Sequence, residues 1–377
     1  MQARRRLVFV SNLETPGIDT LRPANGKVPG STRHDDANLA GTGARELFPP
    51  LRVKTFKQEL PLSAGVLIAL LLLVLAFSGD SFTLNILAAT FLFGGVATAW
   101  NIIGGLGGQF SLGHSVFFAV GAYTTANLYL TFGVSPWLAL VPAALLAGLV
   151  AVALSWPVFR LRGPFFAIAT MAFTEVLLSL AMYFDTFTGG ARGLSIPFRA
   201  GLQNMIFRDR FSYALLMLGF LGVALIVFTA VTRSRLGYSL QAIRDNQDAA
   251  MAAGINVLRT KLVGMAISAA LTGIGGTLFL MYVRVVDPPT LFSLFDIGVK
   301  VALIALIGGI GTIYGPLLGA LLIIPLESML RAELGGAVPG ANLIVLGIIL
   351  ILTSLFLKRG IIGALRKIRW PGTRAST

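Results

Sequence analysis

Long apolar runs dominate the chain from residue 61 onward, and short polar segments separate them. Each run has roughly 20 residues, the length that an α-helix needs to cross the hydrocarbon core of a bilayer. The runs are continuously apolar, whereas the strands of a membrane β-barrel would alternate apolar and polar residues. The pattern therefore predicts an all-α polytopic membrane protein. We expect about ten transmembrane helices, at residues 61–77, 82–103, 111–131, 136–159, 165–184, 211–232, 262–283, 292–310, 315–331 and 340–357.

Polar and basic residues define the regions outside the membrane. Residues 1–59 form a polar leader, which we expect to be disordered because its composition cannot bury a core. Residues 60–358 form the transmembrane domain, and residues 359–377 form a basic tail. Lys and Arg concentrate in the leader, the loop 233–261 and the tail, so the positive-inside rule places both termini in the cytoplasm. The loop 185–210, which this topology places outside, is also net basic and fits the rule poorly.

The residue content excludes several classes of protein. The net charge of +14 would suit a nucleic-acid partner, but the basic residues flank membrane spans, so we expect no nucleic acid. The chain has no Cys and only two His, which argues against disulfides and against a metal site. It also has no phosphate-binding loop, no nucleophile elbow and no zinc-protease motif. We therefore expect no catalytic residues and no cofactor.

Two glycine-rich segments, Ile103–Gly113 and Ile307–Gly319, interrupt the apolar runs. Both begin Ile-Gly-Gly-(Leu/Ile)-Gly, which leaves open an internal duplication of the kind found in transporters. The alternative is that glycine is simply common here, with 43 in the chain. Glycine lets helices approach closely, so these segments predict helix breaks or packing seams. The residues concerned are Gly104, Gly105, Gly107, Gly108, Gly308, Gly309 and Gly311.

Polar residues near the first break and in the run 165–184 are candidates for a polar pathway through the membrane, because such groups are costly in lipid. They are Asn101, Gln109, Ser111, His114, Thr170, Thr174 and Glu175. The alternative is hydrogen bonding between packed helices, which we favour for His114 because no carboxylate is near it in the sequence. Glu175 should either line the pathway or pair with a base on another helix. Lys300 should extend outward, with Asp296 one turn away.

The longest polar segment between the apolar runs contains good helix formers and interspersed charges. It predicts a short helix over Ser239–Ala253 that ends at Gly254, a natural helix terminator. A lipid-binding helix would carry a Lys/Arg cluster with aromatic residues. This helix is close to neutral instead, with Arg244, Asp245 and Asp248. We therefore expect it to contact a soluble protein.

Five motifs lie in order between residues 80 and 330. They are GGLGGQFSLGHSVFFAVGAY at 104–123, FRLRGPFFAIAT at 159–170, TGGARGL at 188–194, AIRDNQDAAMAAGIN at 242–256 and IGGIGTIYGP at 307–316. Through these motifs the chain resembles the membrane-spanning subunits of bacterial branched-chain amino-acid ABC importers. Each motif alone is only a glycine-rich string, but together they are specific.

The resemblance implies a complex in the bacterial inner membrane. The chain would be a permease that pairs with a second homologous permease subunit. Two cytosolic ATPase subunits would supply the energy, and a periplasmic substrate-binding protein would deliver the substrate. The loop 233–261 would be the coupling loop that docks on an ATPase, through Ala242, Arg244, Asp245, Asp248, Ala249, Ala250 and Gly254.

The family pattern is matched by Ala249, Ala250 and Gly254, whereas its usual leading Glu is replaced by Gln247 or Asp248. Three alternatives stay open. The substrate could be urea or a short amide, because related permeases carry these. An ion-coupled secondary transporter is disfavoured by the scarcity of carboxylates in the spans. An enzyme acting on lipids would need a paired acid and base or a metal set, and the sequence offers neither.

Overall fold

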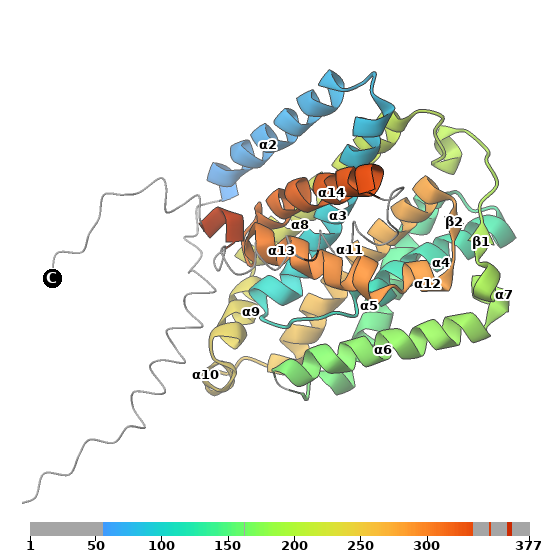
Figure 1. Ribbon diagram of the computed structural model, residues 1–377. Coiled ribbons are helices and arrows are strands. Elements are labelled where there is room, and N and C mark those ends of the chain that lie inside the picture. The colour runs from blue at the N-terminus through green and yellow to red at the C-terminus, as the bar shows by residue number, and fades with distance from the viewer. Residues whose placement is uncertain (1–55, 162, 335–346, 348–359, 364–377) are drawn as a thin grey trace, which may run out of the picture. The chain divides into compact units, whose positions relative to one another are not determined.

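A computed structural model describes residues 56–161, 163–334, 347 and 360–363. Regular structure in these ranges is almost entirely helical (Figure 1). The longer helices are α2 (Phe56–Ala76), α3 (Ser81–Asn101), α4 (His114–Phe132), α5 (Pro136–Val158), α6 (Pro164–Tyr183), α8 (Arg210–Arg233), α9 (Arg235–Asp245), α11 (Val257–Val283), α13 (Lys300–Gly309) and α14 (Gly315–Leu334). Shorter helices are α7 (Asp185–Thr188), α10 (Gln247–Ala252) and α12 (Pro288–Leu291).

Seven helical segments in the described ranges are long and apolar enough to cross a bilayer. They are Ser81–Leu106, Pro136–Val158, Pro164–Tyr183, Arg210–Thr232, Val257–Val283, Pro288–Gly309 and Gly315–Glu333. They match seven of the ten expected spans. The apolar part of α2, Ser63–Ala76, is shorter, and α4 is helical but is not among the seven. Apart from residue 347, the expected span 340–357 lies outside the described residues.

Two of the expected spans are not continuous α-helices. The end of α3 widens into a π-helical turn at Ile102–Leu106, and the chain then runs without helix until His114. The expected span 292–310 consists of a π-helical turn at Leu294–Val299 followed by α13. This turn begins where Ser293 Oγ accepts a hydrogen bond from Asp296 N. Wide π turns often mark functional sites in helices.

Helices α3 and α11 form the centre of the helical bundle. In the segment Ser81–Leu106, 89% of the most apolar stretch of 18 residues is buried. Helix α3 packs against α8, α11 and α14. Helix α11 packs against α4 and α5 through small residues, so a Cβ added to Gly276 would collide with the Phe118 carbonyl. Thr125 Oγ1 and Thr277 Oγ1 are hydrogen-bonded at 2.8 Å across the same contact. Small side chains thus let these backbones approach closely, as is usual between membrane helices.

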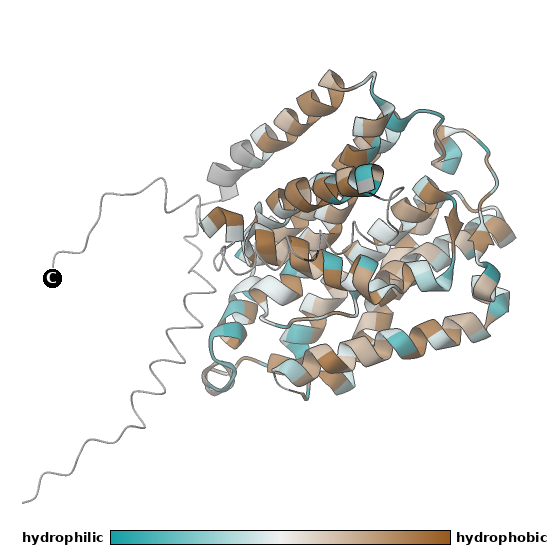
Figure 2. Ribbon diagram, in the orientation of Figure 1, coloured by the Kyte–Doolittle hydropathy of each residue, from teal (hydrophilic) through white to brown (hydrophobic). Residues whose placement is uncertain are grey.

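Helices α5 and α6 lie at the periphery. Only 33% of the most apolar 18-residue stretch of α5 is buried, and only 22% of that of α6. The exposed stripe of α5 is wholly apolar, which suits contact with lipid; it includes Leu138, Val141, Leu145, Leu149 and Trp156. Helix α6 instead exposes Glu175 and Ser179 among its apolar residues. Figure 2 shows apolar colour along most helices and polar colour on α9 and in the connection between α6 and α8.

A two-stranded antiparallel sheet joins the connection after α6 to the connection after α11. Strand β1 (Leu194–Ser195) pairs with β2 (Val285–Val286), with Leu194 opposite Val286. Several helices begin at side-chain caps of the expected kind. Asp209 Oδ2 accepts from Ser212 N at 2.7 Å at the start of α8, and Asn256 Oδ1 accepts from Arg259 N at 3.0 Å at the start of α11.

Candidate functional site

The polar segment predicted as one helix is in fact two, α9 and α10. Asn246 separates them with extended backbone, and its Oδ1 accepts hydrogen bonds from Asp248 N and Ala249 N, both at 3.0 Å. An Asn side chain competes with the helix for such N–H groups, which explains the break. Helix α10 ends before Gly254, whose φ of +83° is the left-handed conformation of a helix terminator.

The predicted coupling residues divide into an inward and an outward group. Ala250 is buried with Ile243 and Val257 in a small apolar cluster, and Ala242 packs against that cluster. The Arg244 side chain is only 7% exposed, whereas Asp245 is 68% exposed. The outward group lies mainly on α10 and just after it; it comprises Asp245, Asp248, Ala249 and Gly254.

Arg244 connects α9 to the first glycine break. Its Nη1 donates to the carbonyl oxygen of Gly105 at 3.1 Å, while Nε and Nη2 donate to Asp245 Oδ1 at 3.1 and 3.0 Å. Gly108 lies beneath the same side chain with φ of +64°, and a Cβ there would stand 2.6 Å from Arg244 Cγ. Only glycine accommodates both this backbone conformation and this contact.

Asn101 connects the first glycine break to the second. Its Nδ2 donates to Thr312 O at 2.9 Å, and its Oδ1 accepts from Gly311 N at 2.7 Å. A Cβ on Gly105 would clash with Asn101 and with Gly311 N, and one on Gly311 would lie 3.6 Å from Arg244 Nη1. The polar segment and both breaks therefore meet at one place, which we call the junction: Asn101, Gly105, Arg244, Gly311 and Thr312.

The other predicted break glycines are buried at close contacts. Gly104 lies under the Trp100 indole, and a Cβ on Gly107 would stand 2.8 Å from Ile103 O. Gly308 packs against the backbone at the start of α14, and Gly309 accepts a hydrogen bond from Thr312 Oγ1 at 2.7 Å. Without a side chain, these four glycines let neighbouring segments pack closely around the junction.

His114 lies fully buried between α4 and α11. Its Nε2 is 2.9 Å from Ser268 Oγ, and its Nδ1 is 3.1 Å from Ser111 Oγ. Ser268 Oγ gives its only proton to Ala99 O at 2.7 Å, so Nε2 must donate to Ser268. In a neutral ring, Nδ1 then accepts from Ser111. These bonds join three helical segments, which is what the packing interpretation of His114 requires.

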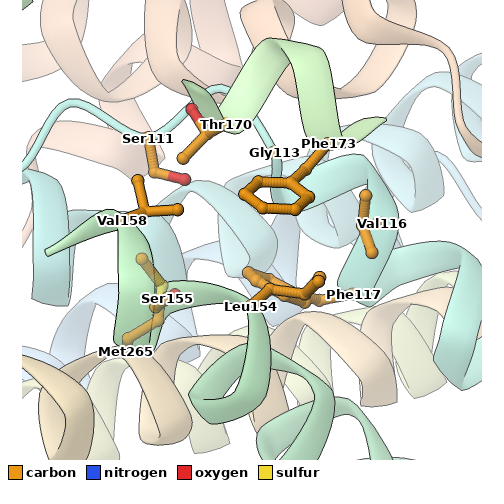
Figure 3. Close-up of a pocket in the computed structure, with 10 residues that line it drawn as sticks. All are labelled: Ser111, Gly113, Val116, Phe117, Leu154, Ser155, Val158, Thr170, Phe173 and Met265. Carbon is orange, nitrogen blue, oxygen red and sulfur yellow. The ribbon is translucent and has the colours of Figure 1, made fainter. Parts of the chain in front are cut away.

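Ser111 and Thr170 line a small cavity between α4, α5 and α6 (Figure 3), and the buried Thr174 lies one turn from Thr170 on α6. Thr170 Oγ1 accepts from Leu112 N at 3.1 Å, and Thr174 Oγ1 donates to Thr170 O at 3.0 Å. The cavity holds about 20 Å³, enough for a water molecule but not for an amino acid.

Gln109 and Glu175 lie away from that cavity. Gln109 is half-buried and donates through Nε2 to Gly107 O at 3.2 Å. Glu175 lies on the exposed side of α6, and it forms no ion pair with the described residues. Four-residue spacing thus brings Thr170 and Thr174 to one buried face, and Glu175 points away from it.

Sequence reasoning missed the main buried ion pair. Lys300 does not extend outward beside Asp296; its Nζ pairs with Glu327 Oε1 at 2.9 Å, and its side chain is 15% exposed. Asp296 accepts from Ser293 Oγ instead, at 2.8 Å. An acidic residue within an apolar run is a signal that could have found Glu327, because it was the same signal that selected Glu175.

Helices of this length and apolarity define a multi-pass membrane protein. Residues 82–354 match the family described as the permease component of the branched-chain amino acid transport system. The chain therefore belongs to this family, and it is a transporter component.

Curated relatives agree with the family. The chain is 30% identical over 315 residues to the high-affinity branched-chain amino acid transport system permease protein LivM of Escherichia coli (strain K12), covering 77% of this chain and 72% of that protein. It is 25% identical over 286 residues to the permease protein LivH of the same organism, covering 71% and 90%. A probable LivM of Methanocaldococcus jannaschii is 26% identical over 220 residues, covering 58% and 62%. No solved structure matches the chain.

Proposed function

We propose that the chain is one of two membrane-spanning subunits of an ATP-driven importer that carries branched-chain amino acids across the bacterial inner membrane. The family match and the names of the similar permeases support this substrate class. Similarity to both LivM and LivH, two permease proteins of Escherichia coli, favours a pair of unlike permeases. Two ATPase subunits and a periplasmic substrate-binding protein complete the proposed complex.

The observation that carries this proposal is the junction, where a polar surface segment contacts both glycine breaks. Helix α10 exposes Asp248, Ala249 and Met251, and a soluble partner can contact them. Helix α9 is bound to the membrane core through the hydrogen bond from Arg244 to Gly105. If an ATPase subunit displaced α10, direct contacts would therefore transmit the displacement to α3 and to the segment before α14.

The proposed topology has ten spans, with both termini in the cytoplasm. The basic residues of the leader 1–59, the coupling loop 233–261 and the tail 359–377 support this orientation. In this arrangement the junction faces the cytoplasm, and the β1–β2 sheet lies at the opposite, periplasmic end. That end is where the substrate-binding protein would dock.

The proposed translocation pathway runs beside α6. Glu175 and Ser179 are exposed on this helix, and an ionised group facing lipid would be costly. A second permease that covers this face would enclose both side chains together with water. Thr170 and Thr174 lie on the buried face of α6; Thr170 Oγ1 accepts from Leu112 N in the segment before α4, whereas Thr174 donates to Thr170 O within α6. The all-apolar stripe of α5 offers the contrasting surface, which suits lipid.

The proposal is tested by co-purification and uptake with the proposed second permease, ATPase and substrate-binding subunits. Ala249→Arg should abolish co-purification of the ATPase and leucine uptake, while the chain stays in the membrane. At Gly254, Asn tolerates a positive φ, so Gly254→Asn should retain the association that Gly254→Arg loses. Retained association in Ala249→Arg and Gly254→Arg would show that α10 is not the docking element. Uptake of urea instead of leucine would overturn the substrate class.

A further inference from the structure

A second cavity, far larger than the first, lies at the end of the bundle opposite the junction. It has a volume of about 610 Å³, within the range of ligand pockets, and it opens between α3, α11, α12, α13 and α14. The first half of α3 lines it, whereas the far end of α3 carries Asn101 of the junction. One wall is apolar and includes Phe82, Ile86, Phe93, Phe279 and Ile324.

The cavity lining also carries two cations and two carboxylates. Glu327 Oε1 accepts from Lys300 Nζ at 2.9 Å and from Arg331 Nη2 at 2.7 Å. Lys300 also lies over the Phe93 ring, 5.4 Å from its centroid. Lys300 and Glu327 are nearly buried and neutralise each other, whereas the Arg331 side chain is 63% exposed.

Arg331 and Asp296 line the cavity and can each form further hydrogen bonds to a ligand in it. Arg331 has five N–H donors, and its hydrogen bond to Glu327 uses only Nη2. Asp296 is exposed and accepts from Ser293 through Oδ2, which leaves Oδ1 without a partner among the described residues. The cavity thus offers one guanidinium and one carboxylate beside an apolar wall, with no net charge on its lining.

We propose that this cavity binds a zwitterion that carries an ammonium group, an oxyanion and an apolar body. Arg331 would hold the oxyanion, because a guanidinium matches carboxylate and phosphate geometry. Asp296 would hold the ammonium group, and Phe82 and Phe279 would contact the apolar part. A simple anion or cation fits less well, because each would face an uncompensated charge of its own sign. Two sources share this chemistry, a branched-chain amino acid and the headgroup of an aminophospholipid.

The test uses the full chain purified in mild detergent. One arm measures binding of radiolabelled L-leucine by scintillation proximity. The other counts retained phosphatidylethanolamine by native mass spectrometry. Arg331→Gln and Asp296→Asn should each weaken binding of the ligand that wild type holds by about tenfold or more. The controls are Arg192→Gln and Asp185→Asn, which remove the same charges from exposed positions elsewhere and should bind as wild type does.

Each result decides the proposal. Leucine binding that both variants weaken assigns the cavity to an amino acid, and retained phosphatidylethanolamine that both variants lose assigns it to lipid. The Lys300–Glu327 pair remains in both variants, so their melting temperatures should stay near that of wild type and a folding defect would be recognised. If wild type binds neither ligand, or if the variants bind as tightly as wild type, the proposal is overturned. Neither result depends on whether α10 docks an ATPase.

Discussion

Arg244 in α9 donates a hydrogen bond of 3.1 Å to the carbonyl oxygen of Gly105, 139 residues earlier in the chain. The acceptor belongs to the π-helical turn Ile102–Leu106 that follows α3, and Asn101 is the last residue of α3, immediately before this turn. Asn101 in turn bonds to Gly311 and Thr312. The side chains of Arg244 and Asn101 therefore connect α9 to two membrane segments that are distant in the sequence.

Arg244→Gln should uncouple transport from the ATPase. A hydrogen bond from a charged donor stabilises by roughly 1.5–3 kcal/mol, so its loss should lower leucine uptake by about tenfold or more. The chain should still insert in the membrane and associate with its partners. Uptake into cells or proteoliposomes measures the effect, and Arg192→Gln is the control for loss of a positive charge. Wild-type uptake in Arg244→Gln would remove the junction from the coupling mechanism.

Gly108 and Gly133 offer a matched pair, because both have φ of +64°. Alanine at either position should cost about 1–2 kcal/mol of stability through backbone strain. A Cβ at Gly133 meets nothing within 4 Å, whereas one at Gly108 would displace Arg244. We therefore expect a lower melting temperature and lower uptake for Gly108→Ala than for Gly133→Ala. Equal uptake by the two variants would contradict a role for this contact.

Asn101→Leu should destabilise the chain by about 2 kcal/mol or more, because it leaves a buried N–H and a buried carbonyl unpaired. These are Gly311 N and Thr312 O. Thr98→Val is the control, since its buried hydroxyl bonds only to the carbonyl of Gly94 one turn earlier in α3. Thermal unfolding in detergent compares the two. A melting temperature for Asn101→Leu no lower than that of Thr98→Val would show that the bridge adds little.

Glu327→Gln should cost roughly 3–5 kcal/mol, because it leaves the Lys300 charge nearly buried without its partner. The double variant Lys300→Met, Glu327→Met removes both charges and should recover most of that stability. Arg331 is exposed enough to reach solvent in either case. The melting temperatures of the two variants measure the difference. Equal losses in both would mean that shape, not charge pairing, matters at this position.

Helices α5 and α6 should respond in opposite ways to a change of polarity. Leu145→Glu places a carboxylate on the apolar outer stripe of α5 and should reduce the amount of chain in the membrane. Glu175→Leu removes the exposed carboxylate of α6, so the amount of chain should be unchanged while uptake falls. Quantitative immunoblots of membranes and uptake assays separate the two effects. Full uptake in Glu175→Leu would place the pathway elsewhere.

The sequence predicted seven of the membrane spans well, because a helix that crosses a bilayer needs a continuous apolar run of about 20 residues. It also indicated the polar segment and its terminator at Gly254, because these depend on local backbone preferences. The break at Asn246 was missed, since an Asn is compatible with both helix and cap until its partners are known. The junction and the Lys300–Glu327 pair were missed for another reason. They join residues far apart in the chain, and spacing alone does not say which distant helices meet.

The hydrogen bonds around His114 have a consequence for proton movement. The chain of donors runs from Ser111 through His114 to Ser268 and ends on the backbone carbonyl of Ala99. A carbonyl oxygen accepts a hydrogen bond but carries no proton to donate. The direction of donation along these hydrogen bonds therefore cannot be reversed. A proton wire must reset after each transfer, and this one has no way to do so. The only histidine in the described helices is therefore held by hydrogen bonds that join α3, α4 and α11, and these bonds do not form a resettable proton path.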